Sequence, residues 1–351
     1  MTVYIRNTTF QATKVKTISQ MRVKLCNSKL FSQTVKLLFL FHLLLLSCLC
    51  YAKEKVVLKV FHAGSLAVPF QRIEALFEKT YPWIDVRRES SGSVMAIRKV
   101  IDLHKPCDVI AVADYSLIPK MMFPRYADHV ALFARNELVL CYTKRSKYHK
   151  IINQKNWYKI LAKKDVKWGF SNPNLDPCGY RAVMCILLSE LYYKAPIFKM
   201  LFETYLPFRL VKKGAFIVAE IPPSFSLTGR KLFIRPKAVE LVGLLESGAI
   251  DYAIEYLSVA KQHHLCFLRL SPEINLGSLK FKDYYLKVAV VLGKKEIHAK
   301  PIVYGIAYLK TSSHPKEAKL FEEFVTGKLG AKILKESYQP PIYPAKVIKC
   351  E

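Results

Sequence analysis

The chain has 351 residues, of which 52% are hydrophobic and 12% aromatic; this excludes a disordered protein and suffices for two domains with cores of their own. The formal net charge of +28 raises the question of nucleic-acid binding. The lysines, however, are spread along the whole chain among acids, with no arginine-rich arm and no recognition motif. We therefore expect no nucleic-acid partner; the charge suits an anionic ligand, an anionic membrane surface, or merely a lysine-rich proteome.

The first 52 residues are typical of an export leader. They contain seven Lys or Arg residues and no acid, and the stretch 37–46 is almost purely apolar. A basic segment followed by a short apolar core is the pattern of a secretory signal, and this core is shorter than the ~20 residues that span a membrane comfortably. Without the leader, the chain has 48 basic and 27 acidic residues. We expect export to the cell surface, at the outer face of the cytoplasmic membrane.

The sequence leaves the processing of this leader open. The segment 45–48 resembles a lipoprotein box, so Cys48 would become a lipidated N-terminus; the alternatives are cleavage near Ala52 and an uncleaved anchor helix. Met21 is an alternative start to Met1 because it gives a basic segment of more ordinary length. None of the last six cysteines forms a pair with metal-ligand spacing, so we expect most of them to be small buried hydrophobes and derive no disulfide.

From Lys55 the pattern alternates between strands and helices. Strands are expected at 56–62, 84–88 and 107–113, with a helix after each of the first two. The near-continuous apolarity of 107–113 is typical of a strand that is buried on both faces. These segments predict a β-α-β-α-β unit with parallel strands.

Two serine turns follow the first two strands, at the edge of the sheet where such folds bind ligands. Ser65, after Gly64, and Ser93 each stand at a helix start with hydroxyl and backbone N–H free. An ordinary helix cap explains either serine alone. Two such turns on one edge make anion binding an equally good explanation. His62, at the end of the first strand, is either a ligand or a side chain packed beside the site.

The segment 137–142 predicts another strand, where we expect the chain to cross into a second lobe. A short strand at 166–170 then leads through the loop 172–181 into a long apolar helix. A helix start is a natural anion site because its N–H groups are unpaired. Asp176 lies in this loop, however, and an acid in an anion site is the first indication of an unusual ligand.

Signals in the remainder of the chain are clear except at 207–230, which we interpret only as a surface excursion. Glu255, at the end of an apolar strand, is either a solvated strand terminus or a ligand in the same cleft as Asp176. We expect helices at 239–247, 258–263, 316–325 and 329–337, and strands at 251–256, 281–292 and 302–310.

Four motifs in the same order resemble the archaeal tungstate- and molybdate-binding proteins of ABC importers. They are FHAGSL (61–66), SSGSVMAIRK (90–99), NPNLDPCGYR (172–181) and LLESGAIDYAIEYLSVA (244–260). The resemblance implies an α/β, two-lobed type II periplasmic-binding-protein fold, with mixed, mostly parallel sheets and a ligand cleft between the lobes. It divides the chain into a leader (1–52), lobe 1 (53–136), lobe 2 (137–300), and a return to lobe 1 with the C-terminal helices (301–351).

The resemblance also implies roles for individual residues. Ser65 and Ser93 would donate from the first lobe and Tyr256 from the second, while Cys178 and Ala238 would supply backbone N–H groups. Asp176 and Glu255 match the two carboxylates that make the metal of the bound oxyanion six-coordinate. The complete implied ligand-binding set is Gly64, Ser65, Ser93, Asp176, Pro177, Cys178, Ala238, Glu255 and Tyr256.

A physical argument supports carboxylates in such a site. At ~4 Å and an effective dielectric of ~20, a carboxylate repels an anion by about 4 kcal/mol per pair of unit charges, so a sulfate or phosphate site would avoid ionised acids. Tungsten(VI) and molybdenum(VI) can accept two further oxygen ligands, whereas sulfur(VI) cannot. Two carboxylates therefore reject sulfate while they bind the heavier ions.

The expected function is that of an extracytoplasmic binding protein that captures tungstate or molybdate and delivers it to a permease with a cytoplasmic ATPase. We expect a monomer that is associated with the membrane through its leader or a lipid anchor, has no cofactor and is not an enzyme. One alternative keeps the fold but binds sulfate, thiosulfate or phosphate. Another is an exported hydrolase with Asp176 and Glu255 as acid and base, although no nucleophile motif such as GxSxG occurs.

Overall fold

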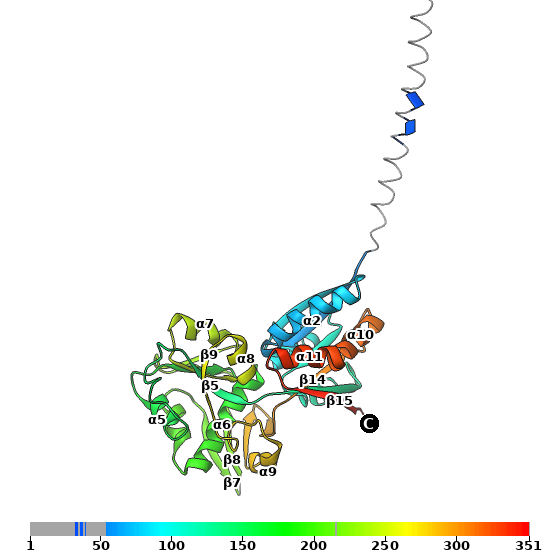
Figure 1. Cartoon of the computed structure of the whole chain (residues 1–351). Helices are drawn as coiled ribbons and strands as arrows, with labels where there is room; N and C mark the ends of the chain where they lie inside the picture. The colour runs from blue at the N-terminus through cyan, green and yellow to red at the C-terminus, as the bar shows by residue number, and fades with distance from the viewer. Residues whose placement is uncertain (1–31, 34–35, 38, 40–53, 215, 351) are drawn as a thin grey trace, which may run out of the picture. The chain divides into compact units, whose positions relative to one another are not determined.

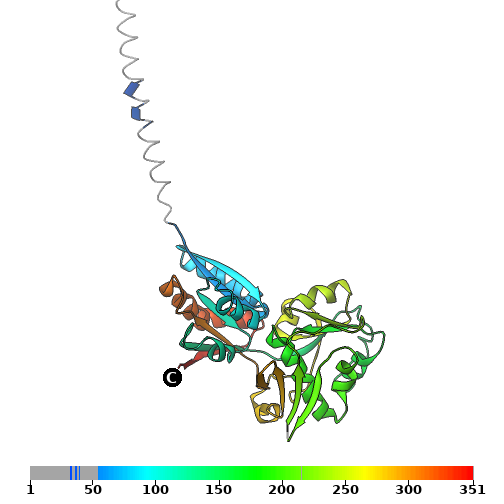
Figure 2. The same cartoon turned by 180° about the vertical axis from the view of Figure 1, so that it is seen from behind.

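The computed structural model describes residues 32–33, 36–37, 39, 54–214 and 216–350. The expectations for leader processing at Cys48 and Ala52 lie outside these residues. The segment Lys55–Glu351 forms one compact unit, which Figures 1 and 2 show from opposite sides. Within the described ranges, no helix combines the length and apolarity needed to cross a membrane.

A six-stranded sheet in the order β15-β4-β14-β3-β1-β2 contains the predicted N-terminal unit. Strand β1 pairs in parallel with both β2 and β3, and helices α2 and α3 make the connections, which confirms the expected β-α-β-α-β arrangement. The bounds are β1 Val56–Ala63, α2 Ala67–Thr80, β2 Ile84–Ser91, α3 Ser93–Ile101 and β3 Val109–Val112.

Antiparallel strands from distant parts of the chain complete this sheet. The sequence did not predict β15, because its prolines weaken the strand signal; the strand lies at the edge of the sheet, where prolines are tolerated. Helices α10 and α11 confirm the two predicted C-terminal helices. The bounds are α4 Leu117–Met122, β4 His129–Arg135, β14 Val303–Tyr308, α10 Pro315–Thr326, α11 Lys328–Glu336 and β15 Pro341–Lys349.

The middle of the chain builds a five-stranded sheet in the order β11-β5-β10-β6-β9. Helix α7 ends at Gly248, which has φ 76°, as expected of a glycine stop. The bounds are β5 Leu138–Tyr142, α5 Trp157–Ala162, β6 Trp168–Ser171, β9 Leu232–Arg235, α7 Glu240–Ser247, β10 Tyr252–Tyr256, α8 Leu257–Gln262 and β11 Cys266–Arg269.

A four-stranded sheet, β13-β12-β8-β7, corrects two expectations. The segment 207–230 is not merely a surface excursion, because it supplies the hairpin of β7 (Arg209–Lys213) and β8 (Phe216–Ile221), and β8 pairs in parallel with β12. The predicted strand at 281–292 is helical up to Tyr285, because the Ser278 hydroxyl accepts from the N–H of Lys280 and caps a helical turn. The bounds are η2 Lys199–Glu203, η3 Leu279–Phe281, α9 Lys282–Tyr285, β12 Val288–Leu292 and β13 Lys295–His298.

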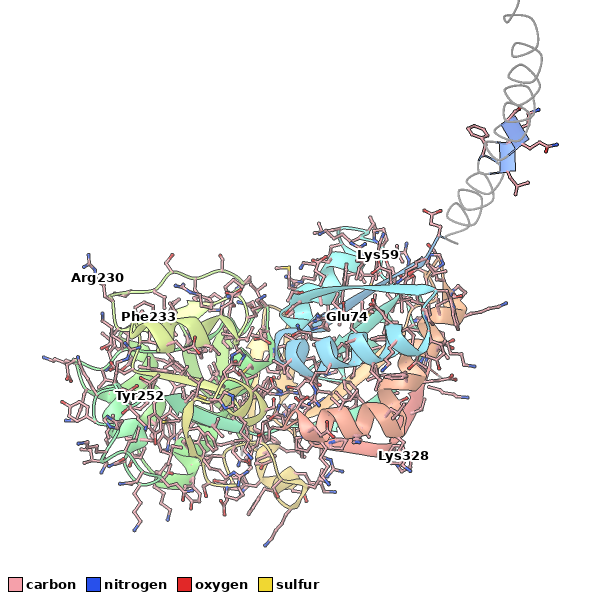
Figure 3. The ribbon with its side chains drawn as sticks, turned by 45° about the horizontal axis from the view of Figure 1, so that its top comes forward. Lys59, Glu74, Arg230, Phe233, Tyr252 and Lys328 are labelled. Carbon is pink, nitrogen blue, oxygen red and sulfur yellow. The ribbon has the colours of Figure 1, made fainter. Side chains whose placement is uncertain are left out.

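The sheets are mixed, as expected, but not mostly parallel. Antiparallel pairs outnumber parallel ones among the described strands, because the returning strands and the hairpins β7–β8 and β12–β13 run antiparallel. One sheet uses 56–135 and 303–349, and the other two use 138–298. Figure 3 accordingly shows Lys59 and Lys328 on one lobe and Tyr252 on the other. We therefore propose the lobe boundaries 53–136, 137–300 and 301–351.

Helix α6, Pro177–Tyr193, is buried on every side along most of its length. All residues from Pro177 to Ser189 are buried, as expected of a helix that is apolar all round. Asp176 caps its N-terminus and Pro177 occupies its first turn, where the missing N–H is not needed. Cys178 and Cys185 on this helix, like Cys107 and Cys141, are buried thiols, as predicted.

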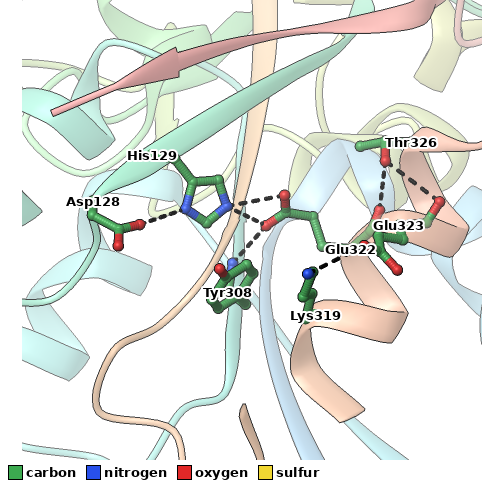
Figure 4. A network of polar contacts seen from close by, with 7 residues as sticks. All are labelled: Asp128, His129, Tyr308, Lys319, Glu322, Glu323 and Thr326. Carbon is green, nitrogen blue, oxygen red and sulfur yellow. Dashed lines mark hydrogen bonds and ion pairs between the residues drawn. The ribbon is translucent and has the colours of Figure 1, made fainter. Parts of the chain in front are cut away.

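A buried acid ties helix α10 to the six-stranded sheet. Glu322 accepts from the N–H of Tyr308 at 2.7 Å and lies 2.9 Å from Nε2 of His129, whose Nδ1 is 2.8 Å from Asp128 (Figure 4). Burial opposes protonation of His129, but the hydrogen bonds and charges of Glu322 and Asp128 outweigh it and raise the pKa of the imidazole. The contact therefore stabilises the protonated histidine.

This contact predicts a stability that falls with rising pH. Because the folded state raises the pKa of His129, its contribution is complete below the unfolded value of 6.5 and is lost as the pH rises through the folded value. His129→Gln should lower the free energy of unfolding by roughly 1–2 kcal/mol at pH 6 and by less at pH 9. Chemical denaturation at both values measures the difference.

His149→Gln is the matched control, because Nδ1 of His149 lies 2.9 Å from the main-chain carbonyl of Ser146 rather than from an acid. A wild-type pH profile for the His129 variant would contradict this account.

Candidate functional site

Lobe 1 brings its two predicted serines together at the carboxyl edge of β1 and β2. Gly64 and Ser65 form the short turn after β1, and Ser93 is the first residue of α3. Both hydroxyls are buried and have partners: Ser65 Oγ lies 2.8 Å from the Tyr304 hydroxyl, and Ser93 Oγ accepts from the N–H of Ala113 at 2.9 Å. The two turns therefore present preformed polar groups at one place.

The carboxylate of Asp176 accepts hydrogen bonds from two backbone N–H groups of lobe 2. Its Oδ1 accepts from the N–H of Cys178 at 3.3 Å, as a helix cap does, and its Oδ2 accepts from the N–H of Ala238 at 2.9 Å. In this structure the two N–H groups expected to face an anion thus donate to the carboxylate. Burial raises the pKa of Asp176, although both backbone N–H groups oppose that rise.

Glu255, on β10, is fully buried rather than a solvated strand terminus. Its Oε2 accepts from the N–H of Tyr256 at 2.6 Å, with the Cys178 thiol 3.7 Å away, whereas Oε1 has no hydrogen-bond partner among the described residues. Burial raises the pKa of Glu255 to about 8, against the lowering effect of the Tyr256 N–H, and the charge of Asp176 raises it further. Glu255 therefore has an oxygen to offer to a ligand.

His62 packs beside the site. Its Nδ1 lies 2.8 Å from the carbonyl of Ala63, its ring packs against Phe70 at 5.4 Å, and it is fully buried. Burial lowers its pKa to about 4, so the ring is neutral at physiological pH. These contacts favour the packing interpretation over a role as a ligand.

Arg181 and Asp114 join the two lobes at the site. Neither residue is among the predicted ligand-binding residues. Arg181 Nη1 donates to the carbonyl of Ala113 at 2.7 Å and to the hydroxyl of Tyr256 at 2.8 Å. Burial alone would raise the pKa of Asp114, but the charges of Lys300 and Arg181 hold it well below its usual range. Two features of the sequence could have pointed to these residues: Arg181 ends the motif 172–181, and Asp114 directly follows the predicted buried strand 107–113.

The lobes also touch through their backbones. The N–H of Met95 donates to the carbonyl of Leu175 at 3.3 Å, and a Cβ added to Gly92 would lie 2.4 Å from the same oxygen. Gly64 lies against a side chain of the other lobe, because a Cβ added to it would lie 3.1 Å from Cγ1 of Val239. The predicted residues of both lobes thus meet in a closed arrangement.

A separate pocket of about 350 Å³ opens beside this arrangement, between α3, α4 and the β12–β13 hairpin. It shares Asn174 with the loop 172–181 but includes none of the predicted ligand-binding residues. Its lining is mainly apolar, with Arg98, Lys294 and Lys295 as its charged members. The buried polar groups of the two lobes, rather than this mainly apolar pocket, offer hydrogen bonds and charge to a small ion.

The charges at the site are unequally paired. Asp114 has Lys300 at 3.2 Å and Arg181 at 3.6 Å, whereas Asp176 and Glu255 have no ion pair within the described part of the chain. Two buried acids that form no ion pair suit a centre that binds carboxylate oxygens directly. No cluster of three or more His, Cys, Asp or Glu suited to a bare metal ion occurs among the described residues.

The chain is similar in sequence to known solute-binding proteins. A family model for bacterial extracellular solute-binding proteins matches residues 58–338. The molybdate/tungstate-binding protein WtpA of Pyrococcus abyssi is 45% identical over 294 residues, which cover 81% of this chain and 84% of that protein. WtpA of Thermococcus kodakarensis is 44% identical over 302 residues, or 84% of each chain.

A solved structure extends the likeness to the fold. The periplasmic molybdate-binding protein of Azotobacter vinelandii superposes with a TM-score of 0.54 at 17% identity, covering 80% of this chain and 98% of that one. At this identity the likeness concerns the fold alone, and it confirms the two-lobed type II arrangement. The chain therefore belongs to the extracellular solute-binding protein family and groups with the two WtpA proteins within it.

Proposed function

We propose that this protein captures tungstate or molybdate between its lobes and delivers the ion to an ABC importer. The observation that carries the proposal is the pair of buried acids, Asp176 and Glu255, which form no ion pair with any described residue and lie beside three hydroxyl groups. The hydroxyls of Ser65, Ser93 and Tyr256 would donate to the oxygens of the anion, and the two acids would add oxygen ligands to its metal. Relatives whose names state molybdate and tungstate binding support this choice of ligand.

Direct coordination also explains how Glu255 can be protonated without a ligand and ionised with one. With a pKa of about 8, Glu255 is largely protonated at pH 7 in the ligand-free protein. A hexavalent metal replaces that proton, because metal-binding carboxylates must be deprotonated. The repulsion that a sulfate ion would meet from an ionised acid becomes a bond when the central atom can expand its coordination.

The raised pKa of Glu255 also favours one alternative, a tetrahedral oxyanion such as sulfate, thiosulfate or phosphate. A neutral carboxyl group does not repel such an anion and can donate a hydrogen bond to it. Calorimetry with tungstate, molybdate, sulfate, thiosulfate and phosphate separates the two functions. Tungstate and molybdate should bind far more tightly than the other three; binding of both at millimolar or weaker affinity would rule against the proposal.

The remaining parts of the proposal concern transport. The protein would act at the outer face of the cytoplasmic membrane as a monomer, held there by its leader or a lipid anchor on Cys48. Its partners would be a permease and a cytoplasmic ATPase. It would bind its ligand without breaking a bond and without a cofactor, so purified protein should turn over no ester, phosphate or glycoside in a hydrolytic screen.

The coordination proposal predicts a change in selectivity when either acid is removed. Asp176→Ala and Glu255→Ala should each weaken tungstate binding at least about tenfold, since losing even a group that only supports a metal ligand costs 10–100-fold. The advantage of tungstate over sulfate should shrink in both variants, because only tungstate loses a bond to its metal. Competition calorimetry measures both ratios.

Glu246→Gln removes an exposed acid of the same lobe and serves as the control. Wild-type selectivity in both alanine variants would refute direct coordination.

The close approach of the lobes at Gly92 predicts that closure and binding are linked. Gly92 has an ordinary extended conformation, φ −61° and ψ 142°, so alanine fits the local backbone. Its methyl group would meet the Leu175 carbonyl of the other lobe, and such overpacking costs about 1–3 kcal/mol. Gly92→Ala should therefore weaken tungstate affinity about tenfold or more, which calorimetry measures.

Gly243→Ala is the control, since a Cβ at that position has no neighbour within 4 Å. Tungstate binding of wild-type strength by the Gly92 variant would show that the lobes do not need this contact.

A further inference from the structure

The three hydroxyl groups of the candidate site have one feature in common: another group already occupies an acceptor position on each oxygen. A hydroxyl that accepts from a neighbour directs its own hydrogen elsewhere, and that hydrogen is then available to a ligand. The direction of each hydrogen bond can be worked out from partners that are able only to donate or whose orientation is fixed.

The direction of two of the three hydrogen bonds is fixed because one partner in each can only donate. The backbone N–H of Ala113 can only donate, so Ser93 Oγ accepts at 2.9 Å. A guanidinium also can only donate, so the Tyr256 hydroxyl accepts from Arg181 Nη1 at 2.8 Å. Neither the Ser93 nor the Tyr256 hydrogen has an acceptor among the residues that the structure describes.

The third direction depends on the orientation of Asn136. Its Oδ1 accepts from the N–H groups of Glu137 at 3.1 Å and Ser258 at 3.4 Å, so this atom is the oxygen of the amide. Nδ2 can therefore only donate, and its two hydrogens face three acceptors: Ser258 Oγ at 2.8 Å, the Tyr304 hydroxyl at 3.1 Å and Gln339 Oε1 at 3.4 Å. All three contacts agree with this orientation.

Tyr304 can therefore place its own hydrogen in one direction. Its hydroxyl oxygen has two partners in the described structure, Asn136 and Ser65. Since Nδ2 of Asn136 cannot accept, the Tyr304 hydrogen goes to Ser65 Oγ at 2.8 Å, and the Ser65 hydrogen is left for the site. The opposite arrangement would leave the hydrogen of the fully buried Tyr304 without an acceptor, which is costly.

We propose that Tyr304, oriented by Asn136, is a positioning residue that commits the Ser65 hydroxyl to donate to the bound oxyanion. Ala113 and Arg181 do the same for Ser93 and Tyr256. The site then offers three donors in fixed directions, which suits an oxyanion whose oxygens at these three points carry no proton. This inference rests on the proposed function, since it concerns the same ligand.

The test is a double-mutant cycle of Tyr304→Phe and Ser65→Ala, read by tungstate calorimetry. Phenylalanine keeps the ring that packs on Phe133 and Tyr256, with centroids 6.3 and 6.0 Å away, and Asn136 keeps Ser258 Oγ as an acceptor at 2.8 Å. The fold should therefore survive. Tyr304→Phe should weaken tungstate binding about tenfold, and the double variant should bind no more weakly than Ser65→Ala alone.

Tyr308→Phe, on the same strand but beside His129, is the control and should bind as the wild type does. Wild-type affinity in Tyr304→Phe, or losses that simply multiply in the double variant, would overturn the inference.

Failure of the proposed function gives a different result. If the wild type binds sulfate and not tungstate or molybdate, the proposed ligand is wrong, and the same cycle read with sulfate still decides whether Tyr304 acts through Ser65. If the wild type binds none of the three ions, both proposals are wrong.

Discussion

A guanidinium keeps its charge at physiological pH, so a fold that buries one must surround it with acceptors. Arg181 is 2% exposed, and its partners come from both lobes: the carbonyl of Ala113 and the carboxylate of Asp114 from one, and the hydroxyl of Tyr256 from the other. Removing one partner of a buried charge pair costs about 3–5 kcal/mol. This requirement ties together the two sheets that form the proposed site, and it also orients one of the hydroxyls proposed to bind the ligand.

The acids around Arg181 show how position decides the chemistry of a carboxyl group. Asp114 is buried, yet Lys300 and Arg181 hold its pKa well below the usual range. Glu255 is equally buried, but its partners among the described residues are only a backbone N–H and a thiol, and its pKa rises to about 8. Asp114 thus stays an anion that serves the structure, whereas Glu255 has one oxygen without a hydrogen-bond partner in the described part of the chain and a proton that can be replaced. These two properties distinguish a structural acid from one that can bind a metal centre.

The local pattern of the sequence predicted those parts of the fold that depend on local contacts. The β-α-β-α-β unit and helix α6 follow from apolar spacing, as do the serine turns at the sheet edge. Strand β15 pairs with β4, and the hairpin β7–β8 joins its sheet through the pairing of β8 with β12; no local window contains these distant partners. The motifs supplied the candidate residues of the site but not their bonding: Arg181 and Ala113 are 68 residues apart, and Asn136 and Tyr304 are 168 apart. The pairing of the Cys178 and Ala238 N–H groups with Asp176 likewise requires the folded geometry.

In such a site, affinity and selectivity are determined by different residues. Hydroxyl donors stabilise any tetrahedral dianion, because they respond to the charge on its oxygens and not to its central atom. Acids do the opposite, since they repel the oxygens and gain only from a central atom that accepts more ligands. At ~4 Å and an effective dielectric of ~20, the repulsion of about 4 kcal/mol per unit-charge pair exceeds a typical net hydrogen bond of ~1 kcal/mol several times over. Under the proposed coordination, two ionised acids would therefore reverse the order of affinities that the hydroxyls alone would give, which accounts for Asp176 and Glu255 at the proposed site.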